Sequence, residues 1–193
     1  MTTTDKPSAP AAEWTDHALL ALDHVGKVEL IDGELLKMSP AGPEHEDIGS
    51  ILIIALGNVV NPARLGRIYG SSAGYRMASG NLLSPDVSFI SAGRLKGRRA
   101  QYKKFLKLAP DLAVEILSPD DSRNDALRKM PEYFANGARL AWIIDPDRRT
   151  VEIITHPDHL TRTLTLADTL TADPVIPHFS LKLTTLFDPP DFD

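Results

Sequence analysis

Apolar residues recur at helical spacing in two long segments of this chain. In SPAGPEHEDIGSILIIALGNVV, steps of three and four residues link Ile48, Ile51, Leu52, Ala55, Leu56 and Val59. This spacing predicts a helix that buries one stripe, with its acids near the N-terminal end of the helix dipole. A second helix is predicted from about Ser122 to Asn136, because Asn136-Gly137 favours a left-handed C-cap. WTDHALLALD predicts a short helix with Thr15 or Asp16 as its N-cap.

Other segments show the alternation or the short apolar runs that are typical of strands. VELIDGELLKM alternates around Asp32-Gly33, a dipeptide that favours a two-residue hairpin turn. GRIYGSSAGYRMASG, LLSPDVSFI and TVEIITH also predict strands, and LTLADTLTADPVIPHFSLKL has the turn residues of edge strands and loops. DLAVEIL and LAWIID are almost continuously apolar, which is typical of strands covered on both faces.

The order of these elements predicts a mixed α/β fold. One helix crosses over between the strands Leu112–Leu117 and Leu140–Asp145, so these two strands can be parallel. A chain of 193 residues is long enough for one sizeable core, and residues 13–193 are predicted to form a single domain. Residues 1–12 are polar, rich in Pro, Ala and Thr, and are predicted to be a disordered tail.

Composition narrows the compartment and the chemistry. With 42% hydrophobic residues, no long apolar run and no basic-then-apolar leader, the chain is expected to be cytoplasmic and not membrane-bound. Because it contains no cysteine, any metal must bind oxygen or imidazole ligands. No Gly-rich phosphate loop, G-x-S-x-G elbow or HExxH pair occurs, which argues against Rossmann oxidoreductases, P-loop NTPases, α/β-hydrolases and zincins.

Positive charge is concentrated in one segment, residues 94–107. Because the whole chain has a formal charge of −5 and this segment carries +7, the remainder carries −12. The segment is interpreted either as a solvated loop or as a patch that follows a nucleic-acid backbone. Its candidate nucleic-acid-binding residues are Arg94, Lys96, Arg98, Arg99, Lys103 and Lys104.

Two acids, Asp86 and Glu115, lie within apolar strand segments. A buried charge costs several kcal/mol unless it is paired or bound to a cation. If the two strands are neighbours, both carboxylates can converge on one hard divalent ion such as Mg²⁺. Structural salt bridges to Arg or Lys are the alternative.

A lysine two residues after the acid would complete a familiar metal-nuclease arrangement, but Leu117 occupies that position. The long stem of a lysine can bring an ammonium to the same point from a packed helix. Lys129 lies fourteen residues after Glu115, on the helix that must fold back over the sheet. It is either this displaced lysine or a solvated side chain, and Pro131 is expected to kink the helix or shift its start.

Several segments together resemble the successive motifs of a known bacterial family. These are VELIDGELLKMSPAGPEHEDI, LLSPDVSFI, APDLAVEILSPDDSRNDALRKMPEYFANGARLAWIIDP and TVEIIT, which together span roughly residues 14–160. Their joint pattern is similar to the family described as putative restriction endonucleases, within the PD-(D/E)XK nuclease superfamily. The resemblance implies a restriction endonuclease-like core, in which helices flank a central mixed sheet preceded by an N-terminal hairpin.

The resemblance also implies a catalytic site. Asp86 and Glu115 would be metal ligands, together with the carbonyl of Ile116, and Lys129 would be the displaced catalytic lysine. Glu34 and His45 match the family pattern as well. Glu34 would be an outer-shell metal partner or form a hairpin salt bridge, and His45 would orient water or phosphate, or cap loop carbonyls. Tyr133 would hydrogen-bond near the site or pack beneath the helix.

Two functions remain open from the sequence. The first is a metal-dependent hydrolase, an endonuclease that uses Mg²⁺ or Mn²⁺ to cleave DNA, for which a homodimer would suit cleavage of both strands. The second is a catalytically inactive module that keeps the fold and binds protein or nucleic acid.

Overall fold

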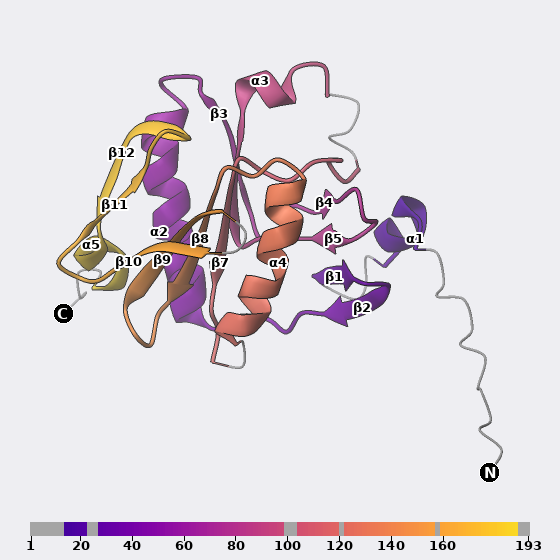
Figure 1. Ribbon diagram of the computed structural model, residues 1–193, viewed down its shortest axis with the longest axis horizontal. Coiled ribbons are helices and arrows are strands. Elements are labelled where there is room, and N and C mark those ends of the chain that lie inside the picture. The colour runs from indigo at the N-terminus through magenta and orange to yellow at the C-terminus, as the bar shows by residue number, and fades with distance from the viewer. Residues whose placement is uncertain (1–13, 23–26, 99–103, 120–121, 157–158, 189–193) are drawn as a thin grey trace, which may run out of the picture.

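The computed structural model describes residues 14–22, 27–98, 104–119, 122–156 and 159–188 (Figure 1). The tail predicted for residues 1–12 lies outside this described part. The helices are α1 (Asp16–Leu20), α2 (Pro43–Val60), α3 (Ala92–Leu95), α4 (Arg123–Ala135) and α5 (Leu183–Phe187). The strands are β1 (Val28–Ile31), β2 (Glu34–Lys37), β3 (Gly66–Gly70), β4 (Tyr75–Arg76), β5 (Leu82–Leu83), β6 (Val87–Ser91), β7 (Leu112–Ile116), β8 (Leu140–Asp145), β9 (Thr150–His156), β10 (His159–Leu164), β11 (Thr169–Ala172) and β12 (Ile176–Lys182).

A six-stranded mixed sheet forms the centre, in the order β10-β9-β8-β7-β6-β3. Its pairs are antiparallel except β7 and β8, which run parallel from Leu112 opposite Leu140 to Ile116 opposite Ile144. Helix α4 makes the connection between these two strands, as a parallel pair requires. The sequence prediction of a mixed α/β fold with one crossover helix is therefore confirmed.

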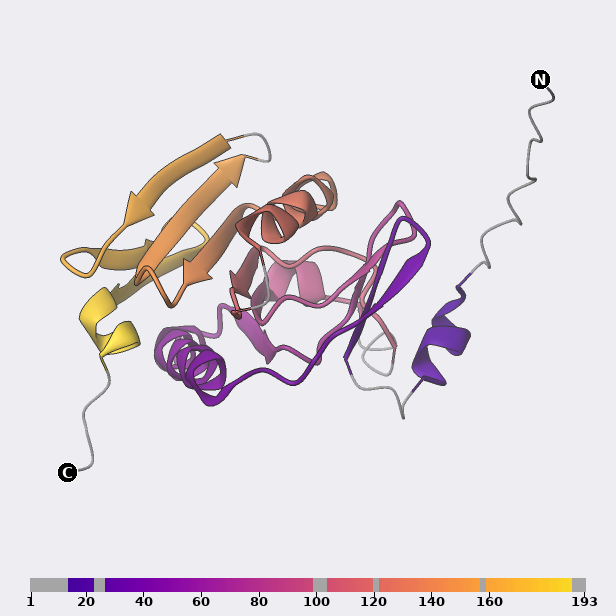
Figure 2. The same cartoon turned by 90° about the horizontal axis from the view of Figure 1, so that it is seen from below.

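Helices α2 and α4 cover opposite faces of the sheet, as Figures 1 and 2 show. Strand β7 illustrates why: Val114 and Ile116 pack in the cluster that includes Leu52 of α2, whereas Ala113 packs with Met130 of α4. Successive side chains of a strand point to opposite faces. Glu115 therefore faces α4, within a strand whose residues are all buried.

The stripe predicted for the first long helix is the buried face of α2. Of the predicted stripe, Ile48, Leu52 and Leu56 are buried in the core cluster, and three more residues are partly buried against it: Ile51, Ala55 and Val59. Helix α4 begins after Ser122, whose side-chain oxygen accepts a hydrogen bond from the Asp125 amide at 3.1 Å. This N-cap satisfies one of the amides left without a partner in the first helical turn.

The predicted hairpin is formed by β1 and β2, and its turn residues Asp32 and Gly33 both have positive φ, at 51° and 84°. A two-residue turn of this kind matches the twist of the flanking strands. The sequence did not predict that β1 would join β4 and β5 in a second sheet, with the order β2-β1-β5-β4. Strands β4 and β5 have only two residues each, too few to produce a periodic pattern.

The C-terminal segment forms the two-stranded sheet of β11 and β12, followed by α5. Phe179 of β12 lies against Trp142 of β8, with ring centroids 5.9 Å apart. Figure 2 shows this segment beside α2, at the end of the molecule away from the β1–β2 hairpin. No helix in the described part of the chain is long and apolar enough to cross a membrane.

Candidate functional site

Asp86 is held against the end of β7. It lies directly before β6, one residue outside the strand in which the sequence placed it. Its amide donates to the Val114 carbonyl at 2.9 Å, and its Oδ2 accepts from the Ile116 amide at 2.8 Å. These two bonds fix both the backbone and the side chain of Asp86 beside the last residues of β7.

Two cationic or titratable side chains also reach the Asp86 carboxylate. Lys27 Nζ lies 2.9 Å from Oδ1, and His45 Nε2 lies 3.4 Å from Oδ2. Burial raises the pKa of Asp86, but His45, Lys27 and the Ile116 amide outweigh it and hold the pKa at about 2. Asp86 is therefore ionised at neutral pH. The same contact with Asp86 raises the pKa of His45 despite its partial burial.

Glu115 is enclosed beneath α4. Lys129 Nζ lies 2.9 Å from its Oε2, and the Tyr133 hydroxyl donates to Oε1 at 2.5 Å. Burial raises the pKa of Glu115 to about 7; Lys129 opposes this shift, whereas the charges of Glu29 and Asp86 add to it. Glu115 and Glu29 thus share the single positive charge of the Lys129 ammonium.

Lys129 reaches Glu115 from α4 even though Pro131 lies two residues further along that helix. Helix α4 continues through Pro131 to Ala135, so the expected shift of the helix start does not occur. The Lys129 side chain is 11% exposed. Burial lowers the pKa of Lys129, but the charges of Glu115 and Glu29 raise it by more. The net pKa is above the usual lysine value, so Lys129 remains an ammonium.

Glu29 is the second carboxylate on Lys129, and the sequence analysis did not single it out. It lies in β1, is 1% exposed, and places Oε2 at 2.9 Å from Lys129 Nζ. Its Oε1 accepts from the Ser84 amide at 2.8 Å. Period-two alternation puts Glu29 on the same face as Ile31, which packs against the α4 side of the core. An acid on an apolar strand face was the available signal.

The other two residues taken from the resemblance lie in different settings. His45, in the first turn of α2, contacts Asp86. Glu34 is exposed next to the hairpin turn, opposite Ile31 in the strand register. Among the described residues, no ion pair links Glu34 to Asp86, Glu115 or Lys129.

Residues 94–98 of the basic segment lie in and just after α3, at the other end of β6 from Asp86 (Figure 1), whereas Lys104 lies two residues before Leu106, which pairs with Tyr75 of β4. Arg94 lies 3.3 Å from the Asp111 carboxylate, and Arg98 donates to the Arg94 carbonyl at 3.0 Å. Lys96 and Lys104 are exposed. The remaining two candidates, Arg99 and Lys103, lie outside the described residues.

A pocket of about 470 Å³ opens beside Asp86. It is lined by the first turns of α2, by the loop after β3 and by the end of β7: His45, Glu46, Gly49, Ser50, Ile53, Tyr69, Gly70, Ser71, Ser72, Ala73, Asp86 and Ile116. Small and polar side chains predominate in the loop, so the Asp86 carboxylate is accessible from this side. The volume of the pocket is within the range typical of small-ligand pockets.

The donor set fits a hard divalent cation. The register that pairs Val87 with Val114 brings Asp86 next to Glu115 across β6 and β7. No group of three or more His, Asp or Glu is assembled as a metal cluster among the described residues. Mg²⁺ uses one or two protein carboxylates and keeps several waters, so two adjacent acids are sufficient. Lys27 and Lys129 neutralise these acids here.

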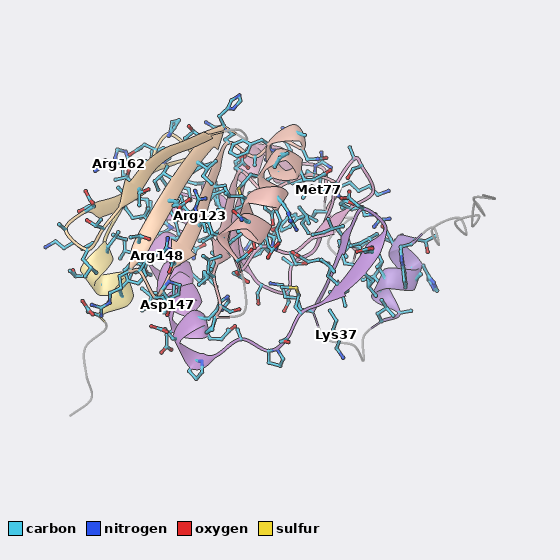
Figure 3. The ribbon with its side chains drawn as sticks, turned by 60° about the horizontal axis from the view of Figure 1, so that its bottom comes forward. Lys37, Met77, Arg123, Asp147, Arg148 and Arg162 are labelled. Carbon is cyan, nitrogen blue, oxygen red and sulfur yellow. The ribbon has the colours of Figure 1, made fainter. Side chains whose placement is uncertain are left out.

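A further acid, Glu152, lies on the same face of the sheet. Glu115, Ile143 and Glu152 are register partners across β7, β8 and β9. Arg123, labelled on the first turn of α4 in Figure 3, places Nε 2.6 Å from Glu152 Oε1. This pair ties the start of α4 to the sheet, near the end of β7 that carries Glu115.

The fold and these residues together define a restriction endonuclease-like class of α/β protein. A family model described as "Putative restriction endonuclease" (Uma2) matches residues 14–184. The chain therefore belongs to this family, and the family resemblance seen in its motifs is confirmed. A comparison with curated proteins found no match.

A solved structure agrees with the fold. A crystal structure of a putative nuclease of the DUF820 group from Anabaena variabilis is similar, with a TM-score of 0.73 and 23% identity over 83% of this chain and 89% of that one. The DrdV–DNA complex, solved by electron cryomicroscopy, matches with a TM-score of 0.36 and 10% identity over 76% of this chain and 14% of that one. The first of these similarities supports the restriction endonuclease-like architecture.

Proposed function

We propose that this protein is a Mg²⁺-dependent endonuclease that hydrolyses phosphodiester bonds of DNA. The observation that carries the proposal is that Asp86 and Glu115 are neighbours in the register of β6 and β7, while Lys129 reaches Glu115 from α4. Membership of a family of putative restriction endonucleases supports the same reaction class. Mn²⁺ is expected to replace Mg²⁺, because both accept carboxylate and water ligands.

Each residue has a distinct role in this proposal. Asp86 and Glu115 would hold the cation, with the Ile116 carbonyl as a third oxygen donor. The bound cation would supply charge neutralisation at the phosphate and a more acidic water. Lys129 would orient the attacking water and stabilise negative charge that develops on the phosphate. His45, which lines the pocket and contacts Asp86, would donate a hydrogen bond to a phosphate oxygen or to water.

The basic segment would bind the nucleic-acid backbone. A strand of five residues spans about 17 Å, so the cations that directly follow β6, such as Lys96, would contact phosphates several nucleotides from the site. Lys96 and Lys104 are the exposed members suited to this role. Arg94 and Arg98 are already engaged in contacts within the protein.

A non-enzymatic binding module is the second candidate. It is favoured by the ion pairs that Asp86 makes with Lys27 and that Glu115 makes with Lys129, because a purely structural cluster would be neutralised in this way. In that case the same fold would bind DNA or protein without cleaving it.

A nuclease assay separates the two candidates. Supercoiled, linear and single-stranded DNA are incubated with the protein in Mg²⁺, Mn²⁺ or EDTA, and the Glu115→Ala variant is compared at equal concentration. The endonuclease proposal expects nicking or linearisation that requires the metal and Glu115. Equal cleavage in EDTA, or by Glu115→Ala, would contradict it; DNA binding without cleavage would favour the binding module.

A further inference from the structure

Glu29 contacts both halves of the proposed site. Its Oε2 lies 2.9 Å from Lys129 Nζ, and its Oε1 accepts from the amide of Ser84 at 2.8 Å. Ser84 is two residues before Asp86, and Pro85 between them has a fixed φ. A single carboxylate is thus bonded to the ammonium of Lys129 and to the backbone that leads directly into Asp86.

The burial of Glu29 argues for a specific arrangement. It is 1% exposed, and a carboxylate in such a position is strongly destabilising unless charged or hydrogen-bonding partners compensate it. Both partners of Glu29 are distant in the sequence: Lys129 lies 100 residues further along the chain, and Ser84 lies 55 residues further along. Such a bond network fixes relative position, because neither partner can move without leaving a buried group unpaired.

The chain places Glu29 on a different sheet from Glu115. Glu29 belongs to β1 of the four-stranded sheet, whereas Glu115 belongs to β7 of the central sheet. Lys129 therefore lies between two carboxylates carried by two independent elements. A lysine side chain has four rotatable bonds, and a second anchor reduces the freedom that Glu115 alone would leave it.

We propose that Glu29 is a positioning residue that sets the Lys129 ammonium relative to Asp86. The inference rests on the proposed function, since Lys129 is the group through which Glu29 would affect cleavage. Glu29 would not bind the cation or the phosphate. It would keep Lys129 pointed at the attacking water after Glu115 has become a metal ligand and no longer holds the ammonium as tightly.

Glu29→Gln is the most informative substitution. The amide oxygen of Gln can still accept a hydrogen bond from the Ser84 amide, but the negative charge that Glu29 places beside the Lys129 ammonium is lost. Misplacement of a catalytic group by about 1 Å can cost about 100-fold in rate, so kcat is expected to fall about 10- to 100-fold while KM changes less than about twofold. Glu132→Gln is the matched control, a glutamate on α4 that instead accepts from the Ser79 hydroxyl at 3.0 Å.

The double variant with Lys129→Ala tests whether Glu29 acts through the lysine. If it does, adding Glu29→Gln to Lys129→Ala lowers kcat no further, because the group being positioned is already absent. If the two losses multiply, or if Glu29→Gln cleaves like the wild type, the positioning role is overturned. The Glu132→Gln control is expected to leave kcat unchanged in both backgrounds.

Chemical labelling gives a readout that does not depend on cleavage. Lys129 is 11% exposed and bonded to two carboxylates, so it should react slowly with acetic anhydride. In Glu29→Gln, acetylation of Lys129 measured by mass spectrometry should become faster, while a solvent-facing lysine such as Lys37 is unchanged. Unchanged labelling of Lys129 would overturn the inference. If labelling rises but the wild type does not cleave DNA, the proposed function fails while the positional role of Glu29 stands.

Discussion

Three charged residues from distant parts of the chain depend on one another in this site. Asp86 keeps a low pKa of about 2 because Lys27, His45 and an amide face it, whereas burial raises the pKa of Glu115 to about 7. Lys129 bridges Glu115 and Glu29. At the scale of single residues, the site therefore holds one carboxylate that is ionised at neutral pH and one whose pKa is raised by burial.

Lys129→Ala tests the displaced lysine. Loss of one preorganised charge at a developing anion typically costs about 100- to 1,000-fold, and kcat should fall by that amount. Binding of Mn²⁺, measured by calorimetry, should be retained or become tighter because a competing positive charge is gone. Lys129→Arg should restore little, since a planar guanidinium cannot replace a compact ammonium. Cleavage by Lys129→Ala at the wild-type rate would remove this residue from the mechanism.

Lys27→Met tests competition between an ammonium and the cation at Asp86. Lys27 lies 2.9 Å from Asp86 Oδ1, where its charge opposes a second cation. We expect Mn²⁺ affinity to rise about fivefold, equivalent to about 1 kcal/mol for a partly exposed pair. Lys37→Met is the control, since Lys37 lies on the same hairpin and projects from it in Figure 3. Equal affinity in wild type and Lys27→Met would place the cation away from Asp86.

His45→Gln gives a pH-dependent prediction. Because contact with Asp86 raises the pKa of His45, the pair stabilises the fold fully below the usual histidine pKa of about 6.5. That stabilisation is lost as pH rises through the raised value. The difference in unfolding free energy between wild type and His45→Gln, from urea titrations, should therefore shrink between pH 6 and pH 9 (about the window of histidine titration). His17→Gln serves as an exposed control; a difference that is constant with pH would contradict the pairing.

At the scale of elements, helix α4 and the β1–β2 hairpin deliver charged groups to a sheet that is otherwise apolar. The Ser122 N-cap sets where α4 begins, and Lys129 follows in its second turn. The hairpin turn at Asp32 and Gly33 sets the register of β1 and β2, in which Glu29 and Glu34 lie on the same face; Glu29 is buried there, whereas Glu34, next to the turn, is exposed. A slip of one residue would turn Glu29 to the other face, away from α4.

The basic segment contains both exposed lysines and an arginine, Arg94, that pairs with a buried acid. Replacing exposed Lys96 and Lys104 by Ser should weaken DNA binding and reduce the slope of log K against log salt by about 0.9 for each phosphate that is no longer neutralised. Arg94→Ser should instead lower the melting temperature, because Arg94 lies beside the buried carboxylate of Asp111. Fluorescence anisotropy at several salt concentrations measures the first effect. If the slope of the double lysine variant matches that of the wild type, the segment does not contact DNA.

At the scale of the whole molecule, cation binding should stabilise the fold. Asp86 precedes β6 and Glu115 lies within β7, so a bound cation would join two central strands. A ligand at about 100 times its Kd adds about 2.7 kcal/mol to the unfolding free energy. Mg²⁺ or Mn²⁺ should therefore raise the melting temperature measured by calorimetry, and EDTA should reverse the change.

Asp86→Asn and Glu115→Gln are the controls for that shift. Each should fold, lose most of the metal-dependent stabilisation, and abolish cleavage. Replacing one of the two adjacent carboxylates also relieves their mutual repulsion, so neither variant is expected to need metal to fold. A metal-induced shift that survives in both variants would place the cation elsewhere in the molecule.

The sequence by itself determined most of the elements and two of the acids. Periodicity located α2, α4, the hairpin and the buried strands, because the 3.6- and 2-residue repeats are local properties of the chain. Asp86 and Glu115 stood out since an acid in an apolar strand requires compensation. The family motifs directed attention to Lys129, and α4 carries it to Glu115 at 2.9 Å.

Only the tertiary structure decided which charges meet. Glu29 rather than Glu34 pairs with Lys129, Lys27 pairs with Asp86, and residues 94–98 of the basic segment follow the far end of β6. None of these follows from local pattern, because β1 pairs with β5, a two-residue strand more than 50 residues away. Long-range pairing of such short strands is fixed by how the two sheets and α4 pack together, and that packing brings Glu29 to a lysine 100 residues further along the chain.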